Sequence, residues 1–291
     1  MTPENLHHLQ SLLVSRTGFL LGADRAHLAA HRLGPVARRE GYSGVDGLME
    51  AVRAEAPAAL AWSAMEAVLN PETWFRRDRK PFATFAREVL PAIARVRPQG
   101  RVRVWSAGCA SGQEAYSLAM PALESEANVE VIATDLSQRS LEKAKSGIYT
   151  QFEVQRGLSA RQLLNWFDQS EDMWEVKPRL RSAVAFARAN LLDEPPPGGR
   201  FDVIFCRYVL GDMAPERRAR ALDVLEQALA DDGCLFLGLD ETAGERPDSF
   251  RPVPGRPGVY RAVSFLRPHF QLDELSVSLR LVAELPQSTN G

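Results

Sequence analysis

The stretch from Arg101 to Met120, RVRVWSAGCASGQEAYSLAM, constrains the fold more than any other part of this 291-residue chain. A short apolar run stops at Gly108, a loop of small residues leads to Gly112, and a helical pattern follows. The apolar run predicts a buried strand, and glycine lets the loop turn tightly and approach a ligand closely. The helix N-terminus adds free N–H groups and partial positive charge. We therefore expect a strand–loop–helix corner that borders a ligand.

The corner begins a part of the chain in which strands alternate with helices. Further strands are predicted at VEVIATDLS, AVAFARANLL, FDVIFCRYVL and CLFLGLD. Helices are predicted between them, at RSLEKAKSG and over residues 215–233, PERRARALDVLEQALADDG. This alternation is typical of a parallel α/β sheet. Residues from Ile148 to about Ser182 break the alternation, which predicts a small inserted subdomain.

Residues 1 to about 70 predict helices only. PENLHHLQSLLVSRTG places its leucines on one helix face and ends at Gly18. ADRAHLAAHRLGPVARREG, SGVDGLMEAVRAEAP and AALAWSAMEAVLN predict further short amphipathic helices, separated by glycine and proline. We expect a small all-α N-terminal domain ahead of the α/β domain.

Composition limits the function classes. The net charge of −2 argues against general nucleic-acid binding. The chain has no apolar run near the roughly 18 residues of a membrane span, and MTPENLHHLQ lacks a signal-peptide core. The three cysteines have no metal-like spacing and indicate reduced thiols in a cytoplasmic protein. His27 and His31 share a helix face without a third ligand, so no metal site is predicted.

An acidic residue closes the second predicted strand. VIATD ends in Asp135, 27 residues after Gly108, where a carboxylate can accept hydrogen bonds from ribose hydroxyls. Helix capping by Asp135 or Ser137 is the alternative, and Ser111 with Glu114 has the spacing of a capping box. The corner and the acid together favour an adenosine-bearing cofactor. Nicotinamide, flavin and S-adenosylmethionine all remain open on these grounds.

Five stretches, in order along the chain, resemble the CheR family of chemotaxis receptor glutamate methyltransferases, which use S-adenosylmethionine. They are NPETWFRRD (70–78), VWSAGCASGQEAYSLAM (104–120), ATDLSQRSLEKAKSGIY (133–149), FARANLL (186–192) and FDVIFCRYVL (201–210). LFLGLDETAG and PGVYR add a weaker match. The resemblance implies a helical domain over 1–80, a Rossmann-like methyltransferase domain over 81–267 with a β subdomain at 148–182, and a tail over 268–291.

The resemblance also implies which residues hold S-adenosylmethionine. Thr73 and Arg77 would lie over the methyl-donor end of the cofactor. Gly108 and Glu114 would border its methionine moiety, and Asp135 would hold the ribose.

Asn190 and Leu191 would flank the adenine, and Arg207 with Tyr208 would close the pocket. A glutamate side chain is ionised at neutral pH, so its methylation needs no general base, and an arginine can hold the incoming carboxylate. Arg77 is the first candidate for that catalytic role and Arg207 the second. The alternatives without a binding role are that Leu191 is an ordinary core residue and that Arg77 is a charge on a helix surface.

The function implied is transfer of a methyl group to glutamate carboxylates of chemotaxis-type receptors, which gives glutamate methyl esters in signal adaptation. The span from Arg25 to Arg39 carries four arginines and two histidines without an acid. This basic helix would face the acidic methylation helices of a chemoreceptor or a related signalling protein, and a solvated helix face is the alternative. Neither nucleic acid nor membrane insertion is expected.

The chain departs from the family pattern at several positions. Pro71 stands where Asn is usual, Arg76 replaces Phe, and Tyr208 replaces Asn. Gly211 replaces an apolar residue, and Asp212 replaces a Tyr near the methyl-transfer site, where an acid would repel an incoming carboxylate. The alternative function is therefore a signalling or interaction protein that binds S-adenosylmethionine or S-adenosylhomocysteine but transfers methyl slowly or never.

Overall fold

The structure, a computed structural model, describes residues 1–54, 57–97, 100–125 and 127–263. Contacts divide the chain into two compact units. One comprises residues 1–71 and 209–221, and the other comprises 72–208 with the residues from 222 onward. The predicted tail over 268–291 lies outside the described residues, and the domain boundaries expected from the sequence remain a prediction.

The first unit is helical. Its N-terminal helices are α1 (Pro3–Thr17), η1 (Ala23–Arg25), α2 (Ala26–Arg39), α3 (Val45–Arg53) and α4 (Ala58–Val68). The side chain of Thr2 caps α1 by accepting a hydrogen bond from the Asn5 N–H, and Gly18 ends it in the left-handed conformation. Leu9 and Leu13, on the predicted leucine face, are fully buried in the core of this unit.

Residues 209–221 complete the helical unit from a distant part of the sequence. They contain η3 (Leu210–Asp212) and the start of α12 (Pro215–Ala228). Phe19 and Met213 form an antiparallel bridge, and the Leu20 N–H donates to the Asp212 carbonyl at 2.7 Å. Arg25 Nη1 lies 2.9 Å from Asp212 Oδ1. The helical unit is therefore discontinuous in sequence.

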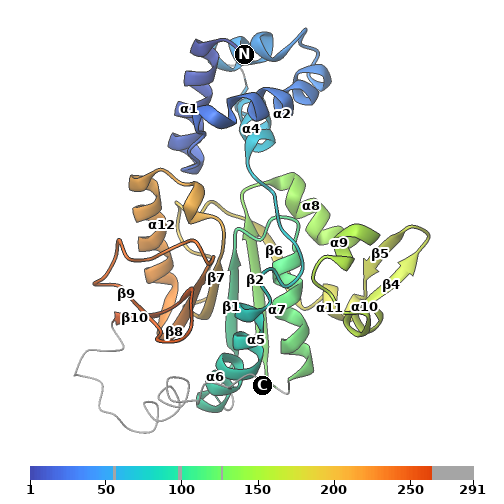
Figure 1. Cartoon of the computed structure of the whole chain (residues 1–291), viewed down its shortest axis with the longest axis vertical. Helices are drawn as coiled ribbons and strands as arrows, with labels where there is room; N and C mark the ends of the chain where they lie inside the picture. Colours follow the sequence, from blue (N-terminus) through green and yellow to red (C-terminus); the bar gives the residue numbers. More distant parts are fainter. Residues whose placement is uncertain (55–56, 98–99, 126, 264–291) are drawn as a thin grey trace. The chain divides into compact units, whose positions relative to one another are not determined.

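A seven-stranded sheet forms the centre of the second unit, which confirms the predicted α/β class (Figure 1). Its strands, in spatial order, are β6 (Val184–Arg188), β2 (Val129–Asp135), β1 (Val102–Ala107), β7 (Phe201–Cys206), β8 (Leu229–Leu237), β10 (Val259–Ala262) and β9 (Phe250–Pro252). The first five are parallel, and β10 and β9 continue the sheet antiparallel. All six residues of β7 are buried, as expected of a central strand covered on both faces.

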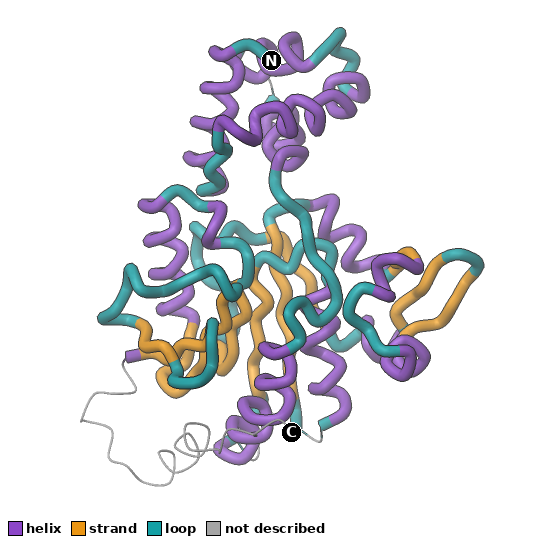
Figure 2. The backbone as a smooth tube through the Cα atoms, viewed as in Figure 1, coloured by secondary structure: helices purple, strands orange, loops and turns teal. Residues whose placement is uncertain are grey.

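The helices of the second unit alternate with these strands. They are α5 (Lys80–Thr84), η2 (Phe85–Val89), α6 (Leu90–Val96), α7 (Gln113–Glu124), α8 (Gln138–Ser146), α9 (Gln151–Gln155), α10 (Ala160–Trp166) and α11 (Pro178–Arg181). A second sheet of three antiparallel strands, β3 (Ile148–Thr150), β5 (Met173–Val176) and β4 (Phe167–Ser170), lies within the stretch that broke the alternation. Figure 2 shows this small sheet apart from the central one. Within the described ranges, each helix is too short or too polar to cross a membrane.

The strand order of the central sheet reverses between β1 and β7. The chain runs outward from β1 through β2 to β6, and then returns to the other side of β1 at β7. In open α/β sheets, ligands bind beyond the carboxyl ends of the strands at such a switch point. A ligand is therefore expected beyond the carboxyl ends of β1, β2, β6 and β7.

The helix predicted over 215–233 is too long. It ends at Ala228, and β8 begins at Leu229. Leu229 pairs with Phe201, and after a register shift Cys234 pairs with Val203. Pairing with β7 therefore overrides the local helical pattern of the last five residues.

Candidate functional site

The loop after β1 is bound to the end of β2. The N–H groups of Gly108 and Cys109 both donate to the Thr134 carbonyl, at 2.8 and 2.9 Å. The Ala110 N–H donates to Asp135 Oδ2 at 2.8 Å. Gly108 adopts φ 80° and Ala110 φ 46°, so the loop turns through left-handed conformations. The predicted corner is therefore a narrow loop fixed against the neighbouring strand.

The helix that follows is not capped as predicted. Gly112 is the N-cap of α7, and no side chain caps it. Ser111 Oγ donates instead to the Gln113 side chain at 2.9 Å. Glu114 accepts hydrogen bonds from Ser106 and Arg207, so the capping box of Ser111 and Glu114 is wrong. A buried arginine and a buried hydroxyl both point at this carboxylate, which is why it does not turn back to the helix start.

Gly112 is expected to tolerate no side chain. At its φ of 93°, a Cβ would lie 2.8 Å from the Ala144 Cβ and 3.2 Å from the Tyr149 hydroxyl. We expect Gly112→Ala to lower the free energy of unfolding by about 2–3 kcal/mol, measured by chemical denaturation. Gly255→Ala is the matched control, because φ there is 69° but nothing lies within 4 Å. It should cost about 1 kcal/mol, and equal losses at the two positions would contradict the crowding argument.

Asp135 connects two loops. Its Oδ2 accepts from the Ala110 N–H and its Oδ1 from the Ser137 N–H, each at 2.8 Å. Ser137, and not Asp135, caps α8 by accepting from the Ser140 N–H at 3.0 Å. The capping alternative thus belongs to Ser137, and the Asp135 carboxylate is held between the loops after β1 and β2.

The loop after β6 lies beside Asp135. The Ala189 N–H donates to the Asp135 carbonyl at 3.1 Å. Asn190 follows directly, and its side-chain oxygen accepts from the Leu192 N–H at 3.2 Å. Leu191 is only partly buried, so it is not ordinary core. The backbone therefore brings Asn190 and Leu191 to the same end of the sheet as Asp135.

Arg207 forms a buried charge cluster at the end of β7. Only 1% of its side chain is exposed, and its Nη1 donates to Glu114 Oε2 at 3.2 Å. Its Nη2 donates to the Asp78 carboxylate and, at 3.0 Å, to the Arg77 carbonyl. Glu114 Oε1 accepts from Ser106 Oγ at 2.9 Å. One guanidinium thus joins β7, α7 and the turn around Arg77.

The pKa of Glu114 is raised by burial, and the charge of Arg207 and the hydrogen bonds from Ser106 and Arg207 only partly offset that effect. Arg207 is the counter-ion of this carboxylate and favours its ionised form against the cost of desolvation. Such a pair places fixed positive and negative charge at the switch point, where a zwitterionic ligand end would meet both.

Arg77 lies between two aromatic rings. Its guanidinium carbon is 3.4 Å from the centroid of the Tyr208 ring and 4.3 Å from that of Trp74. Its Nη1 donates to the Glu72 carbonyl at 3.0 Å. Its Nε is buried and has no hydrogen-bond partner within the described residues. Arg77 belongs to a turn, so the alternative of a helix-surface charge is wrong.

The turn that carries Arg77 is strained. Arg76, Asp78 and Arg79 have φ of 50°, 66° and 50°, a conformation that costs about 1–2 kcal/mol for each residue other than glycine. Clusters of such residues are typical of functional sites.

Tyr208 connects this turn to the loop after β8. Its hydroxyl donates to the Asp78 carboxylate, and its N–H donates to Glu241 Oε2 at 2.6 Å. Burial and the hydrogen bond to Asp78 raise the pKa of Tyr208. Its φ of 60° is also left-handed, so the residue that replaces the Asn of the family pattern is held firmly in an unusual backbone conformation.

The structure brings most of the predicted residues together. Arg77, Glu114, Arg207 and Tyr208 form one contact network. Asp135 ends β2, and Gly108, Asn190 and Leu191 lie in the adjoining loops. Thr73 is half-buried near the start of the turn.

Four residues of the site were missed by the sequence analysis: Trp74, which lies within the NPETWFRRD motif, Asp78, Ser106 and Glu241. Asp78 ends the NPETWFRRD motif, so the motif contained a signal for it. Ser106 lies within the matching stretch VWSAGCASGQEAYSLAM, which likewise contained a signal for it, whereas Glu241 lies in the weaker match LFLGLDETAG.

The donors and acceptors of the site suit a nucleoside joined to an amino acid. The carboxylates of Asp135 and Glu114 can accept hydrogen bonds from hydroxyl and ammonium groups. Arg77 Nε and Arg207 Nε are buried donors without a partner within the described residues, and a buried donor of this kind calls for an acceptor. The residues present therefore fit S-adenosylmethionine.

Comparison with known proteins supports an S-adenosylmethionine site. Residues 71–259 match the family described as CheR methyltransferase, SAM binding domain. Chemotaxis protein methyltransferase 1 of Pseudomonas aeruginosa is 36% identical over 255 residues, which cover 84% of this chain and 93% of that protein. Cher2 of Pseudomonas putida is 34% identical over 83% of this chain and 91% of its own length, and the Vibrio parahaemolyticus enzyme is 33% identical over 85% and 92%.

Two further matches carry no weight. A solved TehB-like SAM-dependent methyltransferase from Corynebacterium glutamicum has a TM-score of 0.36 at 16% identity, covering 64% of this chain and 95% of that one. Residues 249–285 match a tail sheath gpW/gp25-like domain, but β9 and β10 within that span belong to the central sheet.

The fold and its site define an S-adenosylmethionine-dependent methyltransferase. Within that class, the chain belongs to the CheR methyltransferase family, since the family match covers more than half of it and the relatives align over most of their length.

Proposed function

We propose that this enzyme methylates glutamate carboxylates of chemotaxis-type receptors and so forms glutamate methyl esters in signal adaptation. The relatives named chemotaxis protein methyltransferases support this proposal. The observation that carries it is Arg77, held between Trp74 and Tyr208 beside the buried Arg207–Glu114 pair, with one buried donor left for an acceptor.

The cofactor site is assigned residue by residue. Asp135 would hold the ribose, Gly108 and Glu114 the methionine moiety, and Asn190 with Leu191 the adenine. When bound, S-adenosylmethionine supplies an electrophilic methyl group. The protein's task is then to orient the nucleophile and to exclude water from it.

Arg77 is assigned to the incoming glutamate. The side chain of glutamate is already ionised at neutral pH, and a guanidinium binds a carboxylate by paired, charge-assisted hydrogen bonds. Stacking on two rings fixes the guanidinium, so little rotamer freedom is lost when the carboxylate binds. Arg207 directs its Nη donors at Glu114, Asp78 and the Arg77 carbonyl, so we assign it to positioning and not to substrate binding. Tyr208 stacks on Arg77, and Thr73 is assigned to the methyl-donor end of the cofactor.

The test is transfer of radiolabelled methyl groups from S-adenosylmethionine to receptor-containing membranes. The label should be released as methanol by mild base, as expected for carboxyl methyl esters, and glutamate-to-alanine changes in the receptor should abolish it. Arg77→Lys should lower kcat/KM at least tenfold, because lysine cannot stack or bind bidentately. Binding of S-adenosylhomocysteine without any transfer would favour the non-catalytic alternative.

Asp212 was the main sequence argument for the non-catalytic alternative. Its carboxylate pairs with Arg25 at 2.9 Å within the helical unit, which reduces the repulsion expected from an isolated charge. We therefore expect Asp212→Tyr to change kcat by less than about threefold, since a paired surface carboxylate contributes little. A tenfold rise in methyl transfer would show that the acid does impede the reaction, and Arg25→Ala should then lower the rate.

Receptor binding is assigned to the exposed basic face of α2. Arg38 and Arg39 are exposed, whereas Arg32 Nη1 donates to the Val68 and Leu69 carbonyls at 3.1 Å and so holds the end of α4. We expect the double change of Arg38 and Arg39 to Ala to raise the KM for receptor about fivefold at low salt, with kcat unchanged. Arg53→Ala, on α3, is the control. An unchanged KM, or a rise that does not shrink at high salt, would contradict this assignment.

A further inference from the structure

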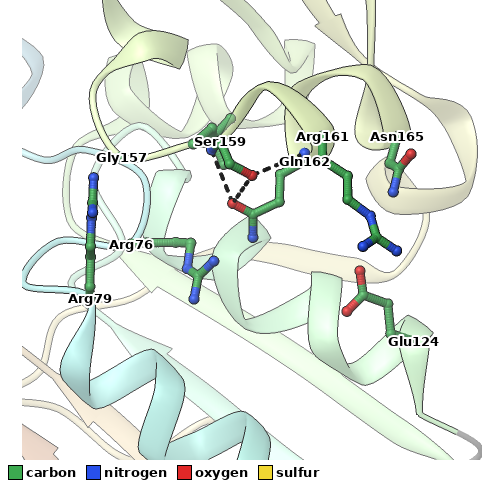
Figure 3. Close-up of a pocket in the computed structure, with 9 residues that line it drawn as sticks. Arg76, Arg79, Glu124, Gly157, Ser159, Arg161, Gln162 and Asn165 are labelled. Carbon is green, nitrogen blue, oxygen red and sulfur yellow. Dashed lines mark hydrogen bonds between the residues drawn. The ribbon is translucent and has the colours of Figure 1, made fainter. Parts of the chain in front are cut away.

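A pocket lies beside the strained turn, within the same unit. Its volume is about 480 Å³, and the turn, α7 and α10 contribute to its lining. The polar residues that matter are Arg76, Arg79, Glu124, Ser159, Arg161 and Asn165. Figure 3 shows Arg76 directed into the pocket, and Arg161 and Glu124 directed toward each other.

The pocket has an excess of positive charge. Three guanidinium groups, those of Arg76, Arg79 and Arg161, line the pocket together with one carboxylate, that of Glu124. Within the part of the chain that the structure describes, none of the three guanidinium groups has a hydrogen-bond or ion-pair partner. Other arginines of this unit are paired, among them Arg207 with Glu114 and Asp78.

Part of this positive charge, that of Arg76, is shielded from solvent. Arg76 is half-buried, and burial followed by the repulsion of Arg79 lowers the pKa of Arg76, although Glu124 partly opposes this. Unpaired like charges in a concave surface repel one another, so an anion that enters gains from all of them. Arg76 is also the residue at which the sequence departs from the family pattern, which has Phe there.

We propose that this pocket binds the phosphate group of a small anion, either free phosphate or a nucleotide. A guanidinium group binds phosphate oxygens through bidentate hydrogen bonds, and three guanidinium groups line this pocket. The Asn165 amide adds a further polar group at the rim. The volume is that of a small-molecule site.

The position of the pocket ties it to the turn at the cofactor site. Arg76 and Arg79 flank Arg77 and Asp78 in the sequence, and these two contact Tyr208 and Arg207. The same strained residues thus carry both sets of side chains.

The test is isothermal titration of the full-length protein with sodium phosphate, and separately with ADP, at an ionic strength kept constant with NaCl. We expect saturable binding of one phosphate group per chain. Arg79→Gln combined with Arg161→Gln should raise the Kd for phosphate at least tenfold, because charge-assisted hydrogen bonds are lost. Both side chains are exposed, so folding should be unaffected. Arg251→Gln, an exposed arginine on β9, removes the same kind of charge elsewhere and should leave the Kd unchanged.

Each outcome decides. Linear heats equal to those of NaCl, or a Kd that the double change leaves unaltered, would overturn the proposal. ADP that binds at least tenfold tighter than phosphate, and loses affinity in the double variant, identifies a nucleotide as the source. Equal affinities that both fall in the variant identify the phosphate group alone. Binding of ADP that is indifferent to Arg79 and Arg161, with no phosphate binding, counts against the pocket.

Discussion

Asp135→Ala is expected to weaken binding of S-adenosylhomocysteine by roughly 100-fold or more. Hydrogen bonds to a charged group are worth about 1.5–3 kcal/mol each, and a ribose offers two hydroxyl donors to one carboxylate. The substitution also removes the acceptor that the Ala110 and Ser137 N–H groups share, so the loops after β1 and β2 lose their common attachment. The measurement is calorimetric titration of the nucleotide.

Two controls separate the ribose contact from the loop attachment. Asp172→Ala removes an exposed acid in the turn between β4 and β5 and should leave the affinity unchanged. Asp135→Asn keeps an oxygen that can accept from one of the two N–H groups, so the fold should persist while affinity still falls at least tenfold. Full affinity in a well-folded Asp135→Ala variant would remove the basis of the proposed cofactor site.

Replacing Arg207 with Leu should lower the free energy of unfolding by about 3–5 kcal/mol. The guanidinium is buried, and its removal leaves the carboxylates of Glu114 and Asp78 without their counter-ion. For a chain of this size the loss corresponds to a fall in Tm of about 10 °C. Arg200→Leu is the control, because the side chains of Arg200 and its partner Asp231 are 55% and 44% exposed, and it should cost less than about 1 kcal/mol.

The pH dependence of this deficit has a defined sign. Burial raises the pKa of Glu114, and Arg207 opposes that rise. The pKa of Glu114 should therefore be still higher in the Arg207→Leu variant. The folded state then holds the proton more tightly than the unfolded state, whose glutamate pKa is about 4.3. Stability is therefore lost as the pH rises above about 4.3 and through the folded-state pKa. The deficit of Arg207→Leu should be larger at pH 8 than at pH 5.

A second substitution tests the cause. Glu114→Gln in the Arg207→Leu background should restore at least about 1 kcal/mol and flatten the pH dependence, because the unpaired buried charge is gone. No recovery at any pH would place the loss in packing around Phe82 and Tyr208, whose rings lie 5.3 Å from the guanidinium carbon.

The sequence predicted those parts of the fold that rest on local pattern. Three features can each be recognised from a few neighbouring residues: the apolar run of β7, the glycines of the loop after β1 and the acid at the end of β2. The end of α12 was misplaced because the pairing of Leu229 with Phe201 depends on a strand far away in the chain.

The site was predicted less completely, for the same reason. Resemblance placed Arg77, Glu114 and Arg207 in one region, but it did not give the direction of their hydrogen bonds. Glu114 has the spacing of a helix cap and instead faces a buried arginine 93 residues away. Such a pairing depends on burial and tertiary contact, which no local pattern records.

The discontinuous helical unit sets an order of events during synthesis. The contact between Arg25 and Asp212 spans 187 residues, so it cannot form until the ribosome has released β1, β2, β6 and β7. Part of the surface of the first helices therefore stays exposed to solvent while the strands of the parallel sheet are being synthesised. Closing so long a loop belongs to the slow phase of folding. A nascent chain stalled before Met213 leaves the ribosome should thus hold a helical unit that proteases still cut.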